Sequence, residues 1–444
     1  MRRVPLALVV PFLLAVTLVA FAAGSSSVTS IVHAGRAARW AALLALFVAA
    51  GALALEGRAF TRLRVSVLVA AGSFLAVAVE SALWSVDPRL TLERAATLVV
   101  LLATATAFAA ACARRPEVAR RLLWGIVAGA AVVTALGLVV LAFDHAAAVE
   151  QATLDLPARY RGFGENPNTV SLLLALCLPI ATWLAFYART RAELVLAVVL
   201  AVAFDASIAA SGSRGALAAG FAGTFLAVAL ARAPARVRLV SAAAVAALLA
   251  ASIAVALAPK SKGEAAPAPP PSTKSAPKPK PGYRNVESDY PLAFDIGTQA
   301  PGEAAPTHRT LFGLTGRGEA WRGAIDQADE RPALGYGFGT EDRVFVDRYA
   351  NFAGGLPENS YIGIYLQLGA VGLAAFLVLV GGLALAAVRT RSRPEASVSL
   401  AVLLAALVLA IAQSYIYSVG NIGTVTVWVC AFLGAAPAGR RVTA

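Results

Sequence analysis

The stretch LVLAVVLAVAFDASIAASGSRGALAAGFAGTFLAVALA, residues 194–231, runs for 38 residues with only two charged side chains. A single helix of this length would be about 57 Å long, whereas the hydrocarbon core of a bilayer is only about 30 Å thick. Arginine clusters flank the stretch on both sides, at 189–191 and at 232–238. Because positive charge collects on the cytoplasmic side of membrane segments, both flanks are expected on one side. The stretch is therefore predicted to form a hairpin of two membrane helices, which turns at residues 211–215 and places Arg214 at the outer surface.

The composition of the whole chain extends this interpretation to the entire protein. Of 444 residues, 59% are apolar and 14% are charged, and the mean hydropathy is +0.72. Soluble proteins are about 45–50% apolar and about 25% charged, so a cytosolic enzyme, a disordered scaffold and a fibrous protein are excluded. The net charge of +13 comes mostly from short arginine clusters between apolar runs, and all five lysines lie between Lys260 and Lys280. This placement is typical of membrane topology signals, so we expect no nucleic-acid partner.

Twelve apolar runs approach the length of about 20 residues that a helix needs to cross a bilayer. The fold class is therefore predicted to be an all-α, polytopic membrane helix bundle. The first run follows Arg2 and Arg3 and resembles a signal peptide, but it lacks a clear small-residue cleavage site and is expected to be a retained span. The predicted spans are 5–23, 40–55, 65–84, 95–112, 122–143, 168–188, 194–210, 215–231, 239–258, 361–388, 398–416 and 422–436.

The distribution of basic residues predicts how the bundle is oriented. Counted over alternate short connections, one set holds 19 basic residues and the other holds 7. The richer set includes both ends of the chain, so both termini are expected in the cytoplasm. The segment 259–357 is left out of the count, because long loops translocate largely regardless of charge, and it is predicted to face outward.

That long loop divides by composition into two parts. Residues 259–282 contain eight prolines and five lysines and nothing that can pack a core, which predicts a semi-extended linker. From 283 to 357 aromatic residues return, and an ordered loop with short helices is expected. The chain is therefore divided into a membrane domain with nine spans at 1–258, the extracytoplasmic loop at 259–357 and a membrane part with three spans at 358–444.

The cysteines and histidines suggest neither a metal site nor a disulfide framework. All three cysteines lie in apolar runs, and the three histidines are scattered singly in outward connections. No Cys-x-x-Cys or Cys/His pattern is present in the sequence. We therefore expect no metal and no other cofactor.

Polar residues at the predicted outer face gather in five short stretches, each of which also has a structural interpretation. WSVDP (84–88) suits an interfacial tryptophan followed by an Asp-Pro turn. In RYRGFGENPN (159–168), Asn166 and Pro167 suit the start of a helix. The arginines and glycines before them could let an anion approach the backbone, so Arg161 is either an anion ligand or an arginine that faces lipid headgroups.

The third stretch is the hairpin turn SGSRG (211–215). Arg214 could extend to the interface, as long basic side chains do, or it could pair internally with Asp205. An ionisable residue inside an apolar span, such as Asp205, is costly and marks a paired or functional group. Glu80 in the third predicted span is a similar but weaker case.

The fourth stretch, residues 316–339, holds a predicted amphipathic helix followed by GYGFG. One face of that helix carries Arg317, Trp321, Ile325 and Ala328. Its apolar part is expected to rest on the membrane domain, with Arg317 pointing into the gap between them. An ordinary amphipathic surface helix is the alternative.

The fifth stretch, ENSY (358–361), opens the tenth predicted span. A glutamate at a helix start is common capping chemistry. Glu358 is therefore either a helix cap or a functional carboxylate at the outer surface.

In this order along the chain, the five stretches resemble the O-antigen ligase/polymerase superfamily of bacterial membrane glycosyltransferases. The matching pieces are WSVDP (84–88), RGFGENPN (161–168), SGSRG (211–215), the GR…W…P…GYGFG run (316–339) and ENSY…LG…G (358–372). The resemblance implies a multi-pass enzyme of the bacterial inner membrane that works at the outer leaflet without metal or nucleotide. Ligases of this family typically carry His-Asn where this chain has Glu358-Asn359, whereas Glu-Asn resembles the polymerase-like members.

The resemblance also implies the chemistry. A glycan would move from a polyprenyl-diphosphate carrier to a sugar hydroxyl on another, lipid-linked glycan, with inversion at the donor sugar. The departing diphosphate develops negative charge, and arginine suits it because its guanidinium stays charged and binds phosphate oxygens in a bidentate manner. Arg161, Arg214 and Arg317 are therefore expected to converge on that diphosphate.

Glu358 is expected to be the general base that takes the proton of the acceptor hydroxyl, and Asn359 beside it to orient a sugar. We expect the carboxylate to be ionised and to act mainly through its position. The other expected substrate-binding residues are Asn168, Trp321 and Asp205, and the next candidate bases are Asp87 and Asp205.

Polymerisation of surface polysaccharide is the favoured function. One alternative is an O-antigen ligase that transfers the glycan to a lipid A–core acceptor. Another is a secondary transporter, because twelve spans with both ends inside also suit that class. Such carriers are often built from repeated halves, but no comparable motif relates residues 1–220 to residues 221–444.

Overall fold

A computed structural model of the chain describes residues 6–56, 63–151, 158–257, 317–345 and 356–436. Helices dominate this part of the chain, and its two strands, β1 (Val149–Glu150) and β2 (Arg159–Tyr160), pair antiparallel. The predicted linker 259–282 and the following residues up to 316 lie outside the described residues.

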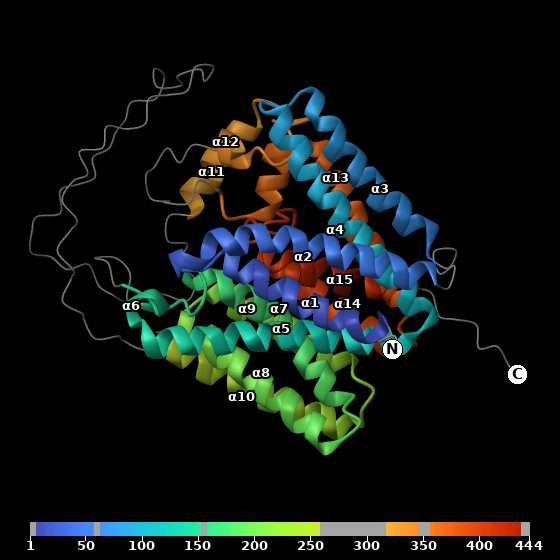
Figure 1. Cartoon of the computed structure of the whole chain (residues 1–444), viewed down its shortest axis with the longest axis vertical. Coiled ribbons are helices and arrows are strands. Elements are labelled where there is room, and N and C mark those ends of the chain that lie inside the picture. Colours follow the sequence, from blue (N-terminus) through green and yellow to red (C-terminus); the bar gives the residue numbers. More distant parts are fainter. Residues whose placement is uncertain (1–5, 57–62, 152–157, 258–316, 346–355, 437–444) are drawn as a thin grey trace, which may run out of the picture.

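Twelve helices correspond one to one to the predicted spans, which confirms the all-α membrane bundle. Among the described residues, nine of them are long and apolar enough to cross a membrane, and α9, α14 and α15 are shorter. The helices are α1 (Leu6–Gly24), α2 (Thr29–Leu55), α3 (Val65–Glu80), α4 (Pro88–Arg114), α5 (Pro116–Phe143), α7 (Pro167–Phe186), α8 (Arg191–Ser211), α9 (Arg214–Leu230), α10 (Ala235–Leu257), α13 (Ser360–Arg389), α14 (Pro394–Ala410) and α15 (Thr424–Leu433). Figure 1 shows α3, α4 and α13 on one side of the bundle and α8 and α10 on the opposite side.

Some helices begin earlier than the apolar runs predicted. α2 starts at Thr29 and α4 at Pro88, each several residues ahead of its predicted span. At α4 the cause is local, because the Asp87 carboxylate accepts a hydrogen bond from the Leu90 N–H (3.1 Å) and proline occupies the first turn. A capped polar turn thus lengthens the helix beyond its apolar segment.

The predicted hairpin at residues 194–231 is confirmed as two helices. α8 ends at Ser211, Gly212 is left-handed (φ 62°), and α9 begins directly afterwards. At the far end, the N–H of Arg232, after α9, donates to the hydroxyl of Tyr187, before α8 (3.1 Å). The start of α8 and the end of α9 therefore lie at the same end of the bundle.

The arginine-rich connections meet at one end of the bundle. Arg115 pairs with Glu56, which joins the connection after α4 to the one after α2 (3.3 Å). Arg120 pairs with Glu193 at the start of α8 (2.7 Å). Arg393 donates to a backbone carbonyl just after α15 (2.8 Å). These contacts join members of the richer of the two predicted sets.

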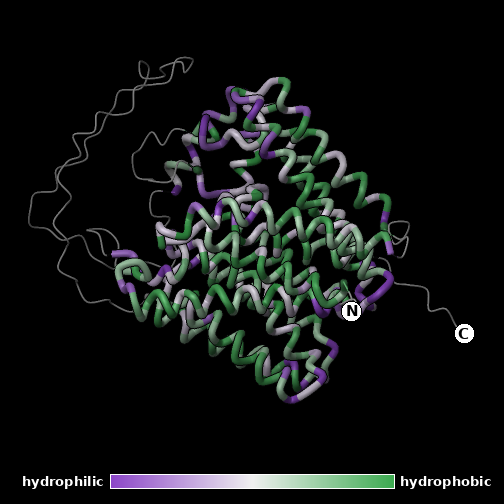
Figure 2. Tube along the Cα trace, viewed as in Figure 1, coloured by the Kyte–Doolittle hydropathy of each residue, from purple (hydrophilic) through white to green (hydrophobic). Residues whose placement is uncertain are grey.

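The connections of the arginine-poor set also meet one another. The N–H of Glu165, before α7, donates to the carbonyl of Ser25, after α1 (2.8 Å). Arg39 Nη1, in the first half of α2, donates to the Gly420 carbonyl between α14 and α15 (3.3 Å). The structure thus groups the connections as the arginine count predicted. Figure 2 shows hydrophobic residues along the helices and hydrophilic ones mainly at the connections.

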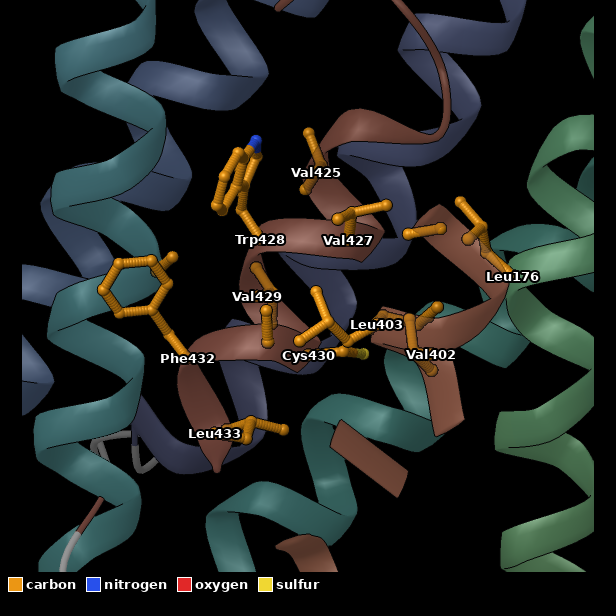
Figure 3. Packing of buried hydrophobic residues seen from close by; sticks show 14 of the residues in the cluster. Leu176, Val402, Leu403, Val425, Val427, Trp428, Val429, Cys430, Phe432 and Leu433 are labelled. Atoms are coloured by element: carbon orange, nitrogen blue, oxygen red, sulfur yellow. The ribbon is translucent and has the colours of Figure 1, made fainter. Parts of the chain in front are cut away.

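The core is centred on α15. All residues of this short helix are buried, and Trp428 Nε1 donates to the Ile416 carbonyl (3.0 Å). Figure 3 shows its side chains beside Leu176 of α7 and Leu403 of α14, within one cluster of buried residues. Because protein surrounds α15, this helix does not need to match the thickness of the bilayer by itself.

α13 is broken at Gly369, whose backbone (φ 62°, ψ −163°) is not helical. Residues 332–337, the inserted segment, fill the break. Two of their N–H groups donate to the carbonyls of Leu366 and Gln367 (3.1 and 2.8 Å), and the N–H just after the break donates back to the segment (2.8 Å). A Cβ on Gly335 would lie 2.5 Å from the backbone carbon of Gln367, so only glycine fits there. The glycines of this stretch therefore anchor residues 332–337 on the bundle.

α11 (Arg317–Ala328), which packs on α13, confirms the predicted helix, and Ala328 of the predicted face is buried, but Ala320 and Ala324 are buried in place of Ile325. Ile325 is 39% exposed. The prediction that Ile325 faces the bundle is wrong, because the small alanines allow a closer approach between the two helices. Figure 1 shows α11 and the short α12 (Glu341–Val344) beside α13.

Candidate active site

An ion pair joins the start of α11 to the turn before α13. Arg317 Nη2 and Nε donate to one oxygen of Glu358, Oε2, at 2.5 and 3.1 Å. The two side chains are 20% and 26% exposed, so the pair is largely shielded but still accessible. The second oxygen of Glu358, Oε1, accepts no hydrogen bond from the residues that the structure describes. The structure thus brings two residues of the predicted site together and leaves one carboxylate oxygen unused.

Glu358 has a strained backbone and does not cap α13. Its φ of 48° makes it the one non-glycine residue with positive φ in the described part of the chain. The cap is Asn359, whose Oδ1 accepts hydrogen bonds from the N–H groups of Tyr361 and Ile362 (3.0 and 3.1 Å). The interpretation of Glu358 as a helix cap is therefore wrong. A residue held in such a conformation costs about 1–3 kcal/mol, and strain of this kind collects at functional sites.

Two predicted substrate-binding residues, Trp321 and Asn359, hold this turn in place. Trp321 Nε1 donates to the carbonyl just before Glu358 (2.9 Å). Asn359 Nδ2 donates to the Ile411 carbonyl, and its backbone N–H donates to Ser414 Oγ (both 3.1 Å). The turn is therefore fixed from α11 on one side and from the connection after α14 on the other.

Arg214 lies in a group of arginines. Arg214 is the first residue of α9, and it lies close enough to Arg317 and Arg159 for their positive charges to act on it. Arg159 on β2 pairs with Glu150 on β1, since its Nε and Nη2 both donate to Oε2 (2.9 and 2.5 Å). Arg159, Arg214 and Arg317, which we call the arginine cluster, thus come together from three distant parts of the sequence.

Arg159 was not predicted as a site residue. The stretch RYR places arginines two residues apart, and such residues share a face of a strand. That spacing, with a glutamate nine residues earlier, was a usable signal for Arg159.

Arg161 has a different environment. Its Nε and Nη2 donate to the carbonyls of Ala147 and Ala146 (both 2.8 Å), and a contact with a third carbonyl is 3.5 Å long. The guanidinium thus ties the end of β2 to α6 (His145–Ala148). Asn168 is half-buried in the first turn of α7, where Asn166 caps the helix as predicted by accepting from its N–H (2.9 Å).

Asp205 contacts α10 instead of an arginine. It lies six residues before the end of α8, about 9 Å along the helix axis. Its Oδ2 accepts a hydrogen bond from Ser252 Oγ (2.7 Å), and its Oδ1 is buried without a partner among the described residues. The structure therefore shows an Asp205–Ser252 pair where an Arg214–Asp205 pair was one alternative.

Chemically, the described site offers a carboxylate with an unused oxygen beside several guanidinium groups. Guanidinium groups bind anions, and a carboxylate can accept a proton. Across the described ranges, no three His, Cys, Asp or Glu side chains gather in a way that could hold a metal ion.

Residues 196–377 match the family model described as O-antigen ligase. The match extends from α8 into α13, so it includes Arg214, Arg317 and Glu358, but it covers less than half of the chain. No curated protein matches the chain. Residues 196–377 are thus similar to the O-antigen ligase family, and the described part of the chain is a multi-pass helix bundle.

Proposed function

We propose that the protein moves a glycan from a polyprenyl-diphosphate carrier to a sugar hydroxyl at the outer leaflet of the bacterial inner membrane. The observation that carries this proposal is the position of Glu358 against the arginine cluster. Glycosyl transfer from a diphosphate needs a group that accepts a proton and groups that stabilise an anion. Both are present at this site.

The arginine cluster suits the diphosphate. Like charges close together raise the electrostatic energy of the site, and within the described residues Arg159 pairs with Glu150 and Arg317 pairs with Glu358. A bound diphosphate would relieve this repulsion through short bidentate contacts. Negative charge grows on the leaving diphosphate as the glycosidic bond breaks, and positioned guanidinium groups stabilise it.

Glu358 takes the proton of the acceptor hydroxyl on its unused oxygen, Oε1. The acceptor oxygen attacks the anomeric carbon of the donor sugar, and the bond to the diphosphate breaks with its electron pair leaving on the phosphate oxygen. Attack from the face opposite the leaving group inverts the configuration of the sugar. Arg317 keeps the carboxylate aligned by holding the other oxygen, Oε2.

The remaining predicted site residues support this centre in the proposal. Trp321 and Asn359 fix the turn that carries the base. Arg161 adds positive charge at the end of β2. Asn168 in α7 and Asp205 in α8 are proposed substrate contacts.

We propose polymerisation of a surface polysaccharide as the reaction, because the resemblance places Glu358 where ligases carry histidine. Transfer to a lipid A–core acceptor is the second candidate, and the description of the matching family favours it. In either case the reaction is proposed to need no metal. The proposed arrangement has membrane parts at 1–258 and 358–444, both termini in the cytoplasm and the loop 259–357 outside.

Reconstitution in proteoliposomes tests the proposal. The donor is a lipid-diphosphate oligosaccharide, and either a second copy of it or lipid A–core is the acceptor. A polymerase produces longer lipid-linked chains, whereas a ligase produces a capped lipid core. Arg214→Ala and Arg317→Ala should lower transfer at least about a hundredfold, as loss of a single stabilising donor does in other active sites. Arg89→Ala, at a residue exposed at the same end of the bundle, is the matched control.

Two results together would contradict the proposal. They are the absence of transfer to both acceptors, and a deletion strain that keeps its long surface glycans but loses uptake of a small solute. That combination would favour the secondary transporter.

A further inference from the structure

A cavity with several polar lining residues lies beside the Glu358 turn. Its volume is about 680 Å³, within the range of about 300–1,000 Å³ that is typical of ligand pockets. Its walls come from α2, the start of α4, the residues around the start of α12 and the connection between α14 and α15. Its main polar and aromatic lining residues are Arg39, Trp40, Arg94, Glu341, Ser414 and Tyr417. The residues of the arginine cluster do not line it.

Glu341 is the most deeply buried acidic residue of this cavity, at 3% exposure. Ser414 Oγ donates to its Oε1 (2.9 Å), and the Tyr417 hydroxyl donates to its Oε2. Burial raises the pKa of Glu341 to about 7, although the hydrogen bonds from Tyr417 and Ser414 oppose the rise. Near neutral pH this carboxyl therefore exists in both protonation states, so that it can donate as well as accept a hydrogen bond.

Arg39 carries donors that the protein leaves unused. Its Nη1 donates to the Gly420 carbonyl (3.3 Å), and its guanidinium carbon lies 4.7 Å from the ring centre of Trp40. Its Nε is buried and makes no hydrogen bond within the described ranges. Since arginine has five N–H donors, most of them remain for a bound molecule. Arg94, which lines the same cavity, is instead already paired with Asp342 (3.0 and 3.3 Å).

Hydrogen bonds connect the cavity to the turn that carries the proposed base. Ser414 Oγ, which donates to Glu341, also accepts from the N–H of Asn359 (3.1 Å). Leu356, two residues before Glu358, lines the cavity. The cavity and the arginine cluster are therefore separate, and they meet at this turn.

The groups in the cavity favour a glycan over a phosphate. Glu341, Asp342 and Glu93 line it together with Arg39 and Arg94, so acidic side chains outnumber the arginines there and a phosphate is disfavoured. Sugar hydroxyls both donate and accept hydrogen bonds, which matches the carboxyl, guanidinium and hydroxyl groups that line this cavity. The apolar face of a sugar ring also packs on an aromatic side chain such as Trp40.

We propose that this cavity binds a sugar residue of the acceptor glycan, adjacent to the sugar whose hydroxyl reacts. The inference rests on the proposed function, because it assumes that two glycans meet at Glu358. The donor's diphosphate occupies the arginine cluster on one side of the turn, which leaves the cavity for the acceptor. Arg39 and Glu341 bind hydroxyls of that sugar and so determine which acceptor is used.

Arg39→Gln tests this assignment, because the side chain makes only one long hydrogen bond within the described protein. The matched control is Arg36→Gln, one turn earlier on α2, where the arginine is exposed and does not line the cavity. With donor saturating and acceptor varied, Arg39→Gln should raise the acceptor KM about tenfold, as loss of a charge-assisted hydrogen bond does. The donor KM and kcat should stay within about twofold of wild type, and Arg36→Gln should match wild type throughout.

A binding measurement keeps this inference separate from the proposed function. The probe is the oligosaccharide released by mild acid from the strain's own lipid-linked precursor, and saturation-transfer NMR on the purified protein reports its binding. Wild type and Arg36→Gln should bind it equally well, and Arg39→Gln should bind it about tenfold more weakly, even if no transfer is detected. The inference is overturned if wild type does not bind the probe, if Arg39→Gln leaves the acceptor KM unchanged, or if the donor KM rises instead.

Discussion

Replacing Glu358 by glutamine is expected to stop glycan transfer while the protein stays folded in the membrane. Glutamine has the same shape and keeps an oxygen for Arg317, which now donates to Oε2 at 2.5 and 3.1 Å. α13 keeps its cap, because Asn359 supplies it. The side chains of Arg317 and Glu358 are 20% and 26% exposed. Their interaction should therefore be stronger than a surface ion pair, which contributes about 0–1 kcal/mol, and weaker than a buried hydrogen bond to a charged group, which contributes about 1.5–3 kcal/mol. The free energy of unfolding should therefore fall by about 1–2 kcal/mol.

The effect on catalysis should be much larger. General-base catalysis contributes about 10²–10⁴-fold to rate, which corresponds to about 3–5 kcal/mol in the activation barrier. A stability loss of about 1–2 kcal/mol lowers Tm by several degrees, and it cannot by itself slow a folded enzyme a hundredfold. The two quantities to measure are the single-turnover rate of transfer in proteoliposomes and the thermal unfolding of the purified protein in detergent.

The control is Glu165→Gln, which changes an exposed carboxylate at the same end of the bundle. This variant should transfer glycan at the wild-type rate. Glu358→His should retain part of the activity, since a neutral imidazole can also accept a proton. If Glu358→Gln transfers glycan as fast as wild type, Glu358 is not the base, and the buried carboxyl of Glu341 is the next one to test.

Three further predictions follow from the packing and charges. Gly363→Ala places a Cβ 2.6 Å from Glu341 Oε1 and should cost about 1–3 kcal/mol in thermal unfolding, whereas Gly382→Ala in the same helix meets nothing within 4 Å and should gain about 0.5–1 kcal/mol. Folding raises the pKa of Glu341 to about 7, so the native protein holds this proton more tightly than the unfolded chain. The contribution of Glu341 to the free energy of unfolding is therefore complete below about pH 4.5, and it falls by about 3 kcal/mol by pH 7. Glu341→Gln removes the titrating group and should flatten the free energy of unfolding between these pH values. Arg159→Ala should raise the donor KM more than Arg161→Ala does, because Arg159 belongs to the arginine cluster. Arg161→Ala should lower Tm more, because the guanidinium of Arg161 bridges two backbone carbonyls. Equal effects of the two variants on KM and on Tm would contradict this prediction.

The spans and their grouping were predictable because they depend on local properties of the chain. The hairpin at 194–231 follows from its length, a glycine at the turn and arginines at both flanks, and each of these is visible in the sequence. The start of α7 at Asn166 and Pro167 is equally local, because a cap needs only neighbouring N–H groups.

The remaining features depend on partners that are distant in the sequence. The apolar run around Gly369 predicts an unbroken helix, and the break exists because residues 332–337 supply hydrogen bonds there. No motif in the sequence singles out Glu341, because Tyr417, which donates a hydrogen bond to its carboxylate, lies 76 residues later. Arg159 and Arg161 look alike in the sequence, and only the position of β1 distinguishes them.

The break in α13 also limits how residues 332–337 and the first half of α13 can move. Backbone hydrogen bonds attach the inserted segment to the first half of α13, and Ser360 at the start of that half-helix is bonded to the connection after α14 (2.6 Å). Glu358 lies at the tip of this block. Swinging the block away would leave several buried backbone groups unpaired, at a cost of about 1–3 kcal/mol each. Residues 332–337 are therefore a fixed part of the bundle, and under the proposed function the substrates have to reach Glu358 without displacing this block.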